Sequence, residues 1–205
     1  MDFMNTHALY QLVDVLSAAI EARDFYTSQH HKRVSRLARL IAQELKLPNE
    51  QIKCIRISAT LHDIGKLGIP TSILTKVGKL RKEEFELIKQ HPVIGEEILQ
   101  KVDFKWPIAK IVRQHHERFD GSGYPDGLAG SDILLEARVI AVADVVESMT
   151  SARPYRHELG LSAAMAEIVK NRGVLYDPDI VDACCKLYDR HKDGMLEVGT
   201  KTNVV

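Results

Sequence analysis

Hydrophobic residues recur at helical spacing along most of the chain. Residues 9–24 carry apolar side chains at the i, i+3, i+4 and i+7 positions of an amphipathic helix, and residues 34–45 repeat this spacing before Pro48. No segment of convincing length alternates apolar and polar residues as a half-buried strand does. The pattern predicts an all-α fold.

Further helices follow from the same spacing and from the glycines and prolines that bound it. Gly65 suits a helix end, whereas Pro92 and Pro107 suit first helical turns. These predicted helices cover about residues 50–64, 82–90, 92–99, 107–116, 134–150, 162–172 and 179–191. The longest irregular stretch, residues 118–132, is rich in glycine, and loops of that length in compact domains are usually functional.

Composition narrows the class of protein. The chain has 205 residues, of which 45% are hydrophobic and 27% charged, as in an ordinary soluble globular protein. Lys plus Arg number 28 and so do Asp plus Glu, so the chain lacks the basic field of a protein that binds a nucleic-acid polymer. We expect a single domain with a core of about residues 7–191 and a flexible tail at 192–205.

Signals for export or membrane insertion are absent from the sequence. The N-terminus has no basic segment followed by an apolar one, and the most apolar stretch, residues 134–149, is interrupted by charged residues. The three cysteines, Cys54, Cys184 and Cys185, show no zinc-ligand spacing. We therefore expect a reduced, cytoplasmic compartment and no membrane insertion.

Candidate chemistry centres on His62-Asp63, which ends a predicted helix of small and apolar residues. In the simpler interpretation, His62 caps the helix and Asp63 pairs with Lys66. In the other, imidazole and carboxylate bind a divalent metal. Five more residues lie on or at the ends of predicted helices and could complete two adjacent metal sites: His30, His91, His115, His116 and Asp144. Spacing alone does not establish that they converge.

The chain resembles a known family at these positions. The order His30, His62-Asp63, Asp144 is similar to the H…HD…D signature of the HD phosphohydrolase superfamily. More specifically, the chain resembles the HD-GYP family, whose two defining motifs match His62-Asp63-Ile64-Gly65-Lys66 and residues 115–125 (HHERFDGSGYP). Two further family blocks match His91-Pro92 with Gly95 and residues 150–156 (TSARPYR), so the resemblance covers about residues 21–176.

The resemblance implies a compact, all-helical HD-domain bundle around a binuclear metal centre, and a cyclic di-GMP phosphodiesterase activity. It implies these metal ligands: His30, His62, Asp63, His91, His115, His116 and Asp144. Asp63 would bridge two metals and act in catalysis together with Lys66, which would also reach the phosphate. Arg153 and Arg156 would bind the phosphate and guanine groups of the substrate, and Tyr124 would line the mouth of the pocket.

The sequence departs from the family pattern at three places. Tyr26 stands where some members have a glutamate that binds a third metal, so we expect two divalent ions, with iron or manganese favoured and zinc or nickel compatible. Gln29 replaces a common glycine, and Glu147-Ser148 stands where Asp-Ala is usual. None of these changes removes a predicted ligand.

The sequence is compatible with more than one substrate and more than one kind of partner. The expected reaction converts cyclic di-GMP to linear pGpG, with onward cleavage to GMP left open. One alternative is a hydrolase that prefers another cyclic dinucleotide, such as cyclic GMP-AMP. Another is a weakly active receptor whose Gly121–Pro125 loop docks onto a diguanylate cyclase-type (GGDEF) domain, and a homodimer is also left open.

Several singled-out residues have structural interpretations instead. We predict that His31 lies on the surface and that Trp106 belongs to the core. Glu117 and Asp120 are expected to fix the conformation of the loop, because carboxylates in loops accept hydrogen bonds from nearby backbone amides.

Overall fold

The computed structural model describes residues 6–23, 30–151 and 159–197. Within these ranges the chain forms helices and no strand, apart from two isolated bridges, Asp120–Ala129 and Arg172–Tyr176. The longer α-helices are α1 (Thr6–Arg23), α2 (His30–Glu44), α3 (Asn49–Leu61), α6 (His91–Leu99), α8 (Leu135–Thr150), α9 (Leu161–Lys170) and α10 (Pro178–His191). The shorter helices are η1 (Ile64–Gly68), α4 (Thr71–Leu74), α5 (Lys82–Ile88), α7 (Ile108–Gln114), η2 (Gly130–Asp132) and η3 (Lys192–Glu197). The prediction of an all-α fold is confirmed.

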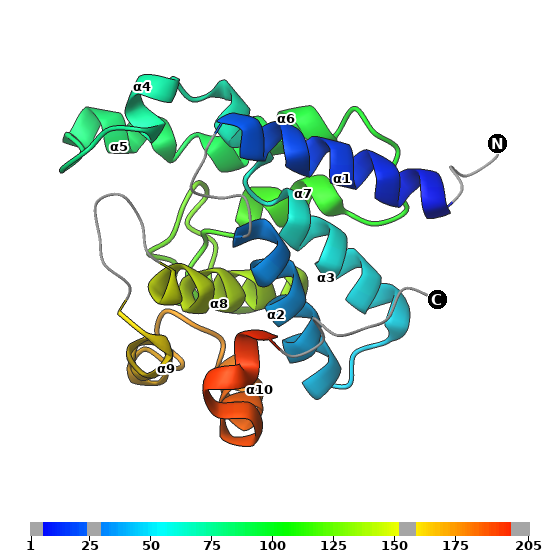
Figure 1. The fold of residues 1–205 in the computed structure, drawn as a ribbon, viewed down its shortest axis with the longest axis vertical. Coiled ribbons are helices and arrows are strands. Elements are labelled where there is room, and N and C mark those ends of the chain that lie inside the picture. Colours follow the sequence, from blue (N-terminus) through cyan, green and yellow to red (C-terminus); the bar gives the residue numbers. More distant parts are fainter. Residues whose placement is uncertain (1–5, 24–29, 152–158, 198–205) are drawn as a thin grey trace.

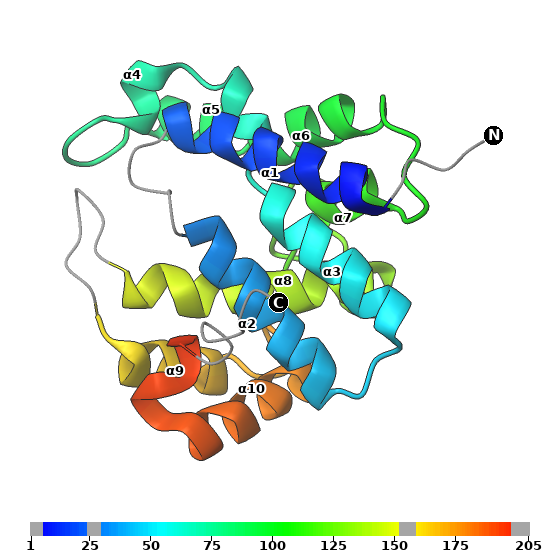
Figure 2. The same cartoon turned by 45° about the vertical axis from the view of Figure 1, so that its right-hand side comes forward.

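Helices α2, α3 and α8 form the centre of the bundle, with α2 packed against both of the others (Figure 1). Helices α9 and α10 lie at one end of this central group, and α4 and α5 lie at the opposite end (Figures 1 and 2). Helix α6 packs against η1 and α7, and α1 packs against α3 and η1. Helices α3 and α7 also contact α8, whereas α6 joins the bundle through η1 and α7.

Burial follows the hydrophobic pattern of the sequence. Helix α2 buries one stripe, which includes Val34, Leu37 and Ile41, and its remaining face is partly buried, with Lys32 and Gln43 exposed. Helix α8 is buried nearly all round, as expected for a helix surrounded by others. Among the described residues, no helix combines the length and the apolar character needed to cross a membrane.

The C-terminal part of the described chain differs from the expectation. Residues 192–197 form η3, which packs against α2 and α10, and Met195 in it is fully buried. The guanidinium of Arg36 donates a hydrogen bond of 2.9 Å to the carbonyl oxygen of Leu196. The prediction of a flexible tail is therefore wrong for residues 192–197, because Met195 and this bond anchor them. Residues 198–205 lie outside the described ranges.

The contact between η1 and α6 depends on Gly65. A Cβ atom at this position would lie 1.8 Å from the carbonyl oxygen of His91 and 2.6 Å from the amide nitrogen of Gly95. Both atoms belong to the backbone, so neither can move aside independently of α6. The absence of a side chain at Gly65 thus lets the HD segment and the start of α6 lie in direct backbone contact.

We expect Gly65→Ala to destabilise the protein strongly. Overpacking of a close contact costs about 3 kcal/mol, which at about 3 °C per kcal/mol for a chain of this size lowers the thermal midpoint by about 10 °C. Differential scanning fluorimetry measures this shift. Gly194→Ala is the matched control, because nothing lies within 4 Å of a Cβ atom there. Equal midpoints for the two variants would show that the contact is not as tight as the structure indicates.

Candidate metal centre

Seven histidine and aspartate side chains from widely separated segments meet in the interior. His30 is the first residue of α2 and His91 the first residue of α6, whereas Asp144 lies in the middle of α8. His62 and Asp63 directly follow α3, and His115 and His116 directly follow α7. All seven predicted metal ligands are thus brought together by helix ends that point toward α8.

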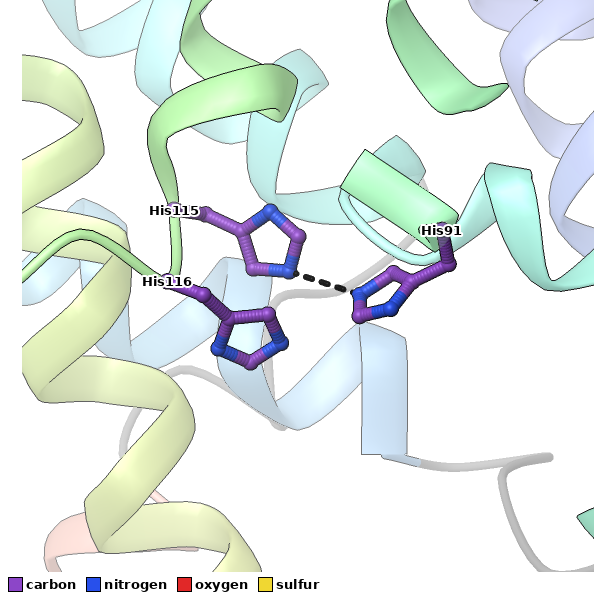
Figure 3. A group of neighbouring side chains, drawn as sticks. All are labelled: His91, His115 and His116. Atoms are coloured by element: carbon purple, nitrogen blue, oxygen red, sulfur yellow. Dashed lines mark hydrogen bonds between the residues drawn. The ribbon is translucent and has the colours of Figure 1, made fainter. Parts of the chain in front are cut away.

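These side chains form three overlapping groups in which the potential ligand atoms all lie within 4.8 Å of one another. The groups are His91 with His115 and His116, His30 with His62 and Asp144, and His62 with Asp63 and His115. Figure 3 shows the first group, in which a ring nitrogen of His91 points toward a ring nitrogen of His115. Because the third group shares His115 with the first and His62 with the second, the seven residues form one continuous cluster.

Three of the imidazoles are oriented in the same way. The Nδ1–H groups of His62, His91 and His115 donate to the carbonyl oxygens three residues earlier, at 2.8, 2.7 and 2.6 Å. With the proton on Nδ1, each Nε2 atom carries a lone pair. The Nε2 atoms of His91 and His115 are only 3.2 Å apart (Figure 3), and two lone pairs at this separation repel unless a cation accepts both. The donor set therefore fits a metal ion.

Burial keeps these imidazoles neutral. Desolvation lowers the pKa of His62 to about 4, that of His91 to about 3 and that of His115 to about 4. The pKa of His116 falls well below its ordinary value for the same reason. Neutral imidazole is the form that binds metal ions, so at neutral pH these side chains need lose no proton to act as ligands.

Asp63 lies between the groups. Its Oδ2 atom accepts a 2.7 Å hydrogen bond from Lys66 and is 3.4 Å from Nε2 of His62, while its Oδ1 atom is 3.4 Å from Nε2 of His91. Burial alone would raise the pKa of Asp63, but the Lys66 ammonium and His62 outweigh it and hold the pKa well below the usual range. The carboxylate is therefore charged, and the predicted pairing of Asp63 with Lys66 coexists with its place in the cluster.

Asp144 lies on the side of the cluster that His30 and His62 form. Its Oδ1 atom is 3.2 Å from Nε2 of His30 and accepts a 3.1 Å hydrogen bond from Ser148. Burial would raise the pKa of Asp144, but the hydrogen bond with His30 lowers it well below its ordinary value. Burial would likewise lower the pKa of His30, yet hydrogen bonds to Asp144 and Glu147 raise it to about 9. Without a bound cation, His30 thus supplies positive charge beside two carboxylates.

His31 lies in the interior beside the cluster. The predicted surface position is wrong, because His31 is completely buried and its Nε2 atom lies 3.4 Å from Oδ2 of Asp63. The signal that could have found it is helical spacing, since His31 falls at i, i+3 and i+7 with the buried Val34 and Ala38. Its ring also lies 5.4 Å from that of His62.

Glu147 is the second residue whose place the sequence did not reveal. It stood out only as a departure from the family pattern, but in the structure it is fully buried and its carboxylate pairs with Nδ1 of His30. The sequence separation of 117 residues explains why no local pattern could show this contact.

The loop after α7 covers the cluster at its His116 side. The rings of Tyr124 and His116 are 4.8 Å apart and tilted by 30°, which supports the predicted place of Tyr124 beside the site. The Glu117 carboxylate accepts hydrogen bonds from the backbone amides of Asp126 and Leu128 at 2.7 and 3.1 Å. Asp120 accepts from the amide of Ser122 at 2.9 Å. The prediction that the two carboxylates fix the loop is confirmed.

The other predicted residues lie away from the cluster or outside the described residues. Trp106 is half-buried and packs against the hydrophobic core, as expected. Arg153 and Arg156, predicted to bind substrate, lie outside the described residues, as do Tyr26 and Gln29. The residues that would carry most of the predicted cationic substrate contacts are therefore not placed by the structure.

A helical bundle that gathers five histidines and two aspartates, six of them at helix ends around Asp144 of α8, defines a class of metal-binding helical domain. A family model described as HD domain matches residues 14–180, and the chain belongs to this family. The resemblance to the HD phosphohydrolases and their HD-GYP members is thus confirmed.

Among curated proteins, the chain is 48% identical over 170 residues to the cyclic di-GMP phosphodiesterase response regulator RpfG of Xanthomonas campestris pv. campestris, with 82% of this chain and 45% of RpfG covered. It is 42% identical over 196 residues to a cyclic di-GMP phosphodiesterase of Thermotoga maritima, with 90% of this chain and 53% of that protein covered. The chain therefore spans about half the length of these curated relatives, and its organisation as a single domain stays a prediction.

Among solved structures, the fold is similar to that of a cyclic GMP-AMP-specific phosphodiesterase from Vibrio cholerae. The TM-score is 0.58 and the identity 29%, and the match covers 89% of this chain and 41% of that protein. Relatives of this chain thus include enzymes named for two different cyclic dinucleotides.

Proposed function

We propose that this chain is a metal-dependent phosphodiesterase that hydrolyses cyclic di-GMP to linear pGpG. The observation that carries the proposal is the buried cluster in which the lone pairs of His91 and His115 face each other at 3.2 Å beside the charged Asp63. The names of the two curated relatives supply the substrate.

We assign the cluster to two divalent ions, with Asp63 as the shared ligand. One ion would be held by His91, His115 and His116, and the other by His30, His62 and Asp144. The overlap of the three groups supports this division, since Asp63 lies within 3.4 Å of both His62 and His91. Nitrogen and oxygen donors without cysteine suit iron or manganese, and zinc or nickel is also compatible.

Bound divalent ions supply Lewis acidity to the phosphodiester and a nucleophilic water near neutral pH. The protein's own groups orient the reaction. The Asp63 carboxylate would hold the attacking water in line with the scissile bond. The oxygen of that water bonds to phosphorus as the bond from phosphorus to the ribose 3′ oxygen breaks, and the proton that the water loses is balanced by the one that the departing 3′ oxygen takes up. Lys66, which is within 2.7 Å of Asp63 and retains 16% of its side-chain exposure, offsets negative charge on the phosphoryl oxygens.

Substrate contacts are predicted outside the cluster. The Tyr124 ring continues outward from the His116 ring, and an aromatic face in this position suits stacking of a guanine base. Arg153 and Arg156 stay predicted phosphate and guanine ligands. Onward cleavage of pGpG to GMP also stays a prediction, which analysis of the late products would test.

Cyclic GMP-AMP is the second candidate substrate, because the similar Vibrio cholerae structure is of an enzyme specific for it. Rates for the two cyclic dinucleotides, measured by HPLC with manganese or ferrous iron, separate the candidates. We expect kcat/KM to be at least about tenfold higher for cyclic di-GMP than for cyclic GMP-AMP. A pocket that hydrogen-bonds guanine discriminates by this much against an adenine in the same place. The opposite ratio would assign the enzyme to cyclic GMP-AMP.

The remaining partners stay predictions. If cyclic di-GMP binds but no product forms, the receptor interpretation is favoured. In that case the Gly121–Pro125 loop would be tested for binding to a GGDEF domain, with Ser122 as the exposed position to mutate. Light scattering after size-exclusion chromatography would test the homodimer, and the cytoplasmic location stays a prediction.

A further inference from the structure

A buried polar network joins the first turn of α2 to the last turn of α8. Glu147 is fully buried, and one carboxylate oxygen pairs with Nδ1 of His30. The other oxygen accepts hydrogen bonds from Nε of Arg33 at 2.5 Å and from the hydroxyl of Ser151 at 2.6 Å. Arg33 also donates to the Ser151 hydroxyl at 3.0 Å, which closes the network. Both oxygens of the buried Glu147 carboxylate are therefore hydrogen-bonded.

His30 differs in this respect from the other oriented imidazoles. His62, His91 and His115 donate their Nδ1–H groups to neutral backbone carbonyls, whereas the Nδ1 atom of His30 meets a carboxylate. A charged acceptor forms the stronger hydrogen bond and increases the electron density on the opposite ring nitrogen. That opposite nitrogen of His30 faces Asp144 at 3.2 Å.

Burying a carboxylate costs free energy unless it is paired and hydrogen-bonded, and Glu147 is both. Arg33 stays 31% exposed, so its charge is only partly desolvated while it neutralises the buried carboxylate. The cost of this arrangement is hard to explain by stability alone, since well-packed apolar side chains would fill the same space at less cost.

We propose that Glu147, held by Arg33 and Ser151, is a positioning residue that fixes the His30 ring with Nδ1–H toward the Glu147 carboxylate and Nε2 toward Asp144. It acts through His30 and touches no reacting group. The inference rests on the metal role proposed for His30. It states that Glu147 increases the affinity of the protein for the ion held by His30, His62 and Asp144. The ion held by His91, His115 and His116 does not depend on it.

The test is calorimetric titration of metal-stripped protein with Mn²⁺ alone, without substrate. For Glu147→Gln we expect one of the two Mn²⁺ equivalents to bind about 10- to 100-fold more weakly, as for other residues that orient a metal ligand. The second equivalent keeps its wild-type affinity. The control is Glu136→Gln, the same change on the same helix, where the carboxylate accepts a hydrogen bond from Gln51 at 2.8 Å. Both Mn²⁺ equivalents should bind to this control as they bind to the wild type.

Two results would overturn the proposal: unchanged affinity of both equivalents in Glu147→Gln, or an equal loss at both, which indicates a general change of structure. If Glu147→Gln does not fold, Arg33→Met decides instead. This variant removes the guanidinium that hydrogen-bonds the carboxylate, and we expect the same single equivalent to weaken by about tenfold, the lower end of the range for residues that orient a metal ligand. Wild-type binding by Arg33→Met would then exclude the network.

A catalytic readout separates this claim from the proposed function. If Glu147 only positions His30, added Mn²⁺ restores most of the lost rate of Glu147→Gln, so the variant differs mainly in its metal requirement. If the wild-type protein binds two equivalents but hydrolyses no cyclic dinucleotide, the proposed function fails, while the affinity difference between the variants still tests the role of Glu147.

Discussion

Asp63→Asn is expected to lower the rate of cyclic di-GMP hydrolysis by about 10³-fold or more, the loss that follows when a group that stabilises the transition state directly is removed. Asp63 approaches His62, His91 and Lys66 at once, through both carboxylate oxygens. The amide keeps the shape of the side chain but carries no charge and binds divalent ions weakly. His62→Ala should abolish hydrolysis as well, because His62 belongs to two of the three groups.

The control for Asp63→Asn is Asp103→Asn, the same change at an exposed position, which should keep full activity. Circular dichroism should show the wild-type helical content for all three variants. A drop in activity with a lost helical signal would reflect misfolding, and His62→Ala then provides the independent test. Full activity in either Asp63→Asn or His62→Ala would contradict the assignment of the cluster to catalysis.

Removal of metal is expected to have the second-largest effect, on stability and activity together. An ion present at 1,000 times its dissociation constant stabilises the folded state by about 4 kcal/mol, and a chain of this size gains about 3 °C per kcal/mol. Stripping the ions should therefore lower the thermal midpoint by about 12 °C. The physical reason is that the stripped protein retains facing lone pairs at His91 and His115 without a cation between them.

Scanning fluorimetry before and after treatment with a chelator measures this change, and added Mn²⁺ should restore both the midpoint and the activity. His115→Ala is the matched control, because it removes a shared member of two groups and should make the midpoint respond less to the chelator. If the chelator changes neither the thermal midpoint nor the activity, the cluster is a polar core that holds no metal.

The long helices could be predicted because each has enough residues to show its period. The helix predicted at residues 134–150 is observed as α8 at Leu135–Thr150, and that predicted at 179–191 is observed as α10 at Pro178–His191. The short helices α4 and η3 were missed, since four to six residues are too few to establish a period. Burial of Met195, which orders η3, depends on α2 and α10.

In the candidate site, the identity of the cluster residues could be predicted from the sequence, but their convergence could not. Motif resemblance pointed to all seven cluster residues, but their convergence could not follow from spacing, because His30 and Asp144 are 114 residues apart and meet only after the helices pack. The burial of His31 could have been inferred from its register with Val34. The pairing of Glu147 with His30 could not, because both the partner and the burial arise from the packing of α2 on α8.

The central claim is that the cluster, when it holds divalent ions, hydrolyses a cyclic dinucleotide. One HPLC time course tests it most directly: cyclic di-GMP is incubated with the metal-stripped protein and with the same sample after manganese or ferrous iron is restored. We expect no product before metal is added and conversion to linear pGpG afterwards. Equal turnover by both samples, or intact cyclic di-GMP in the metal-loaded sample, would contradict it.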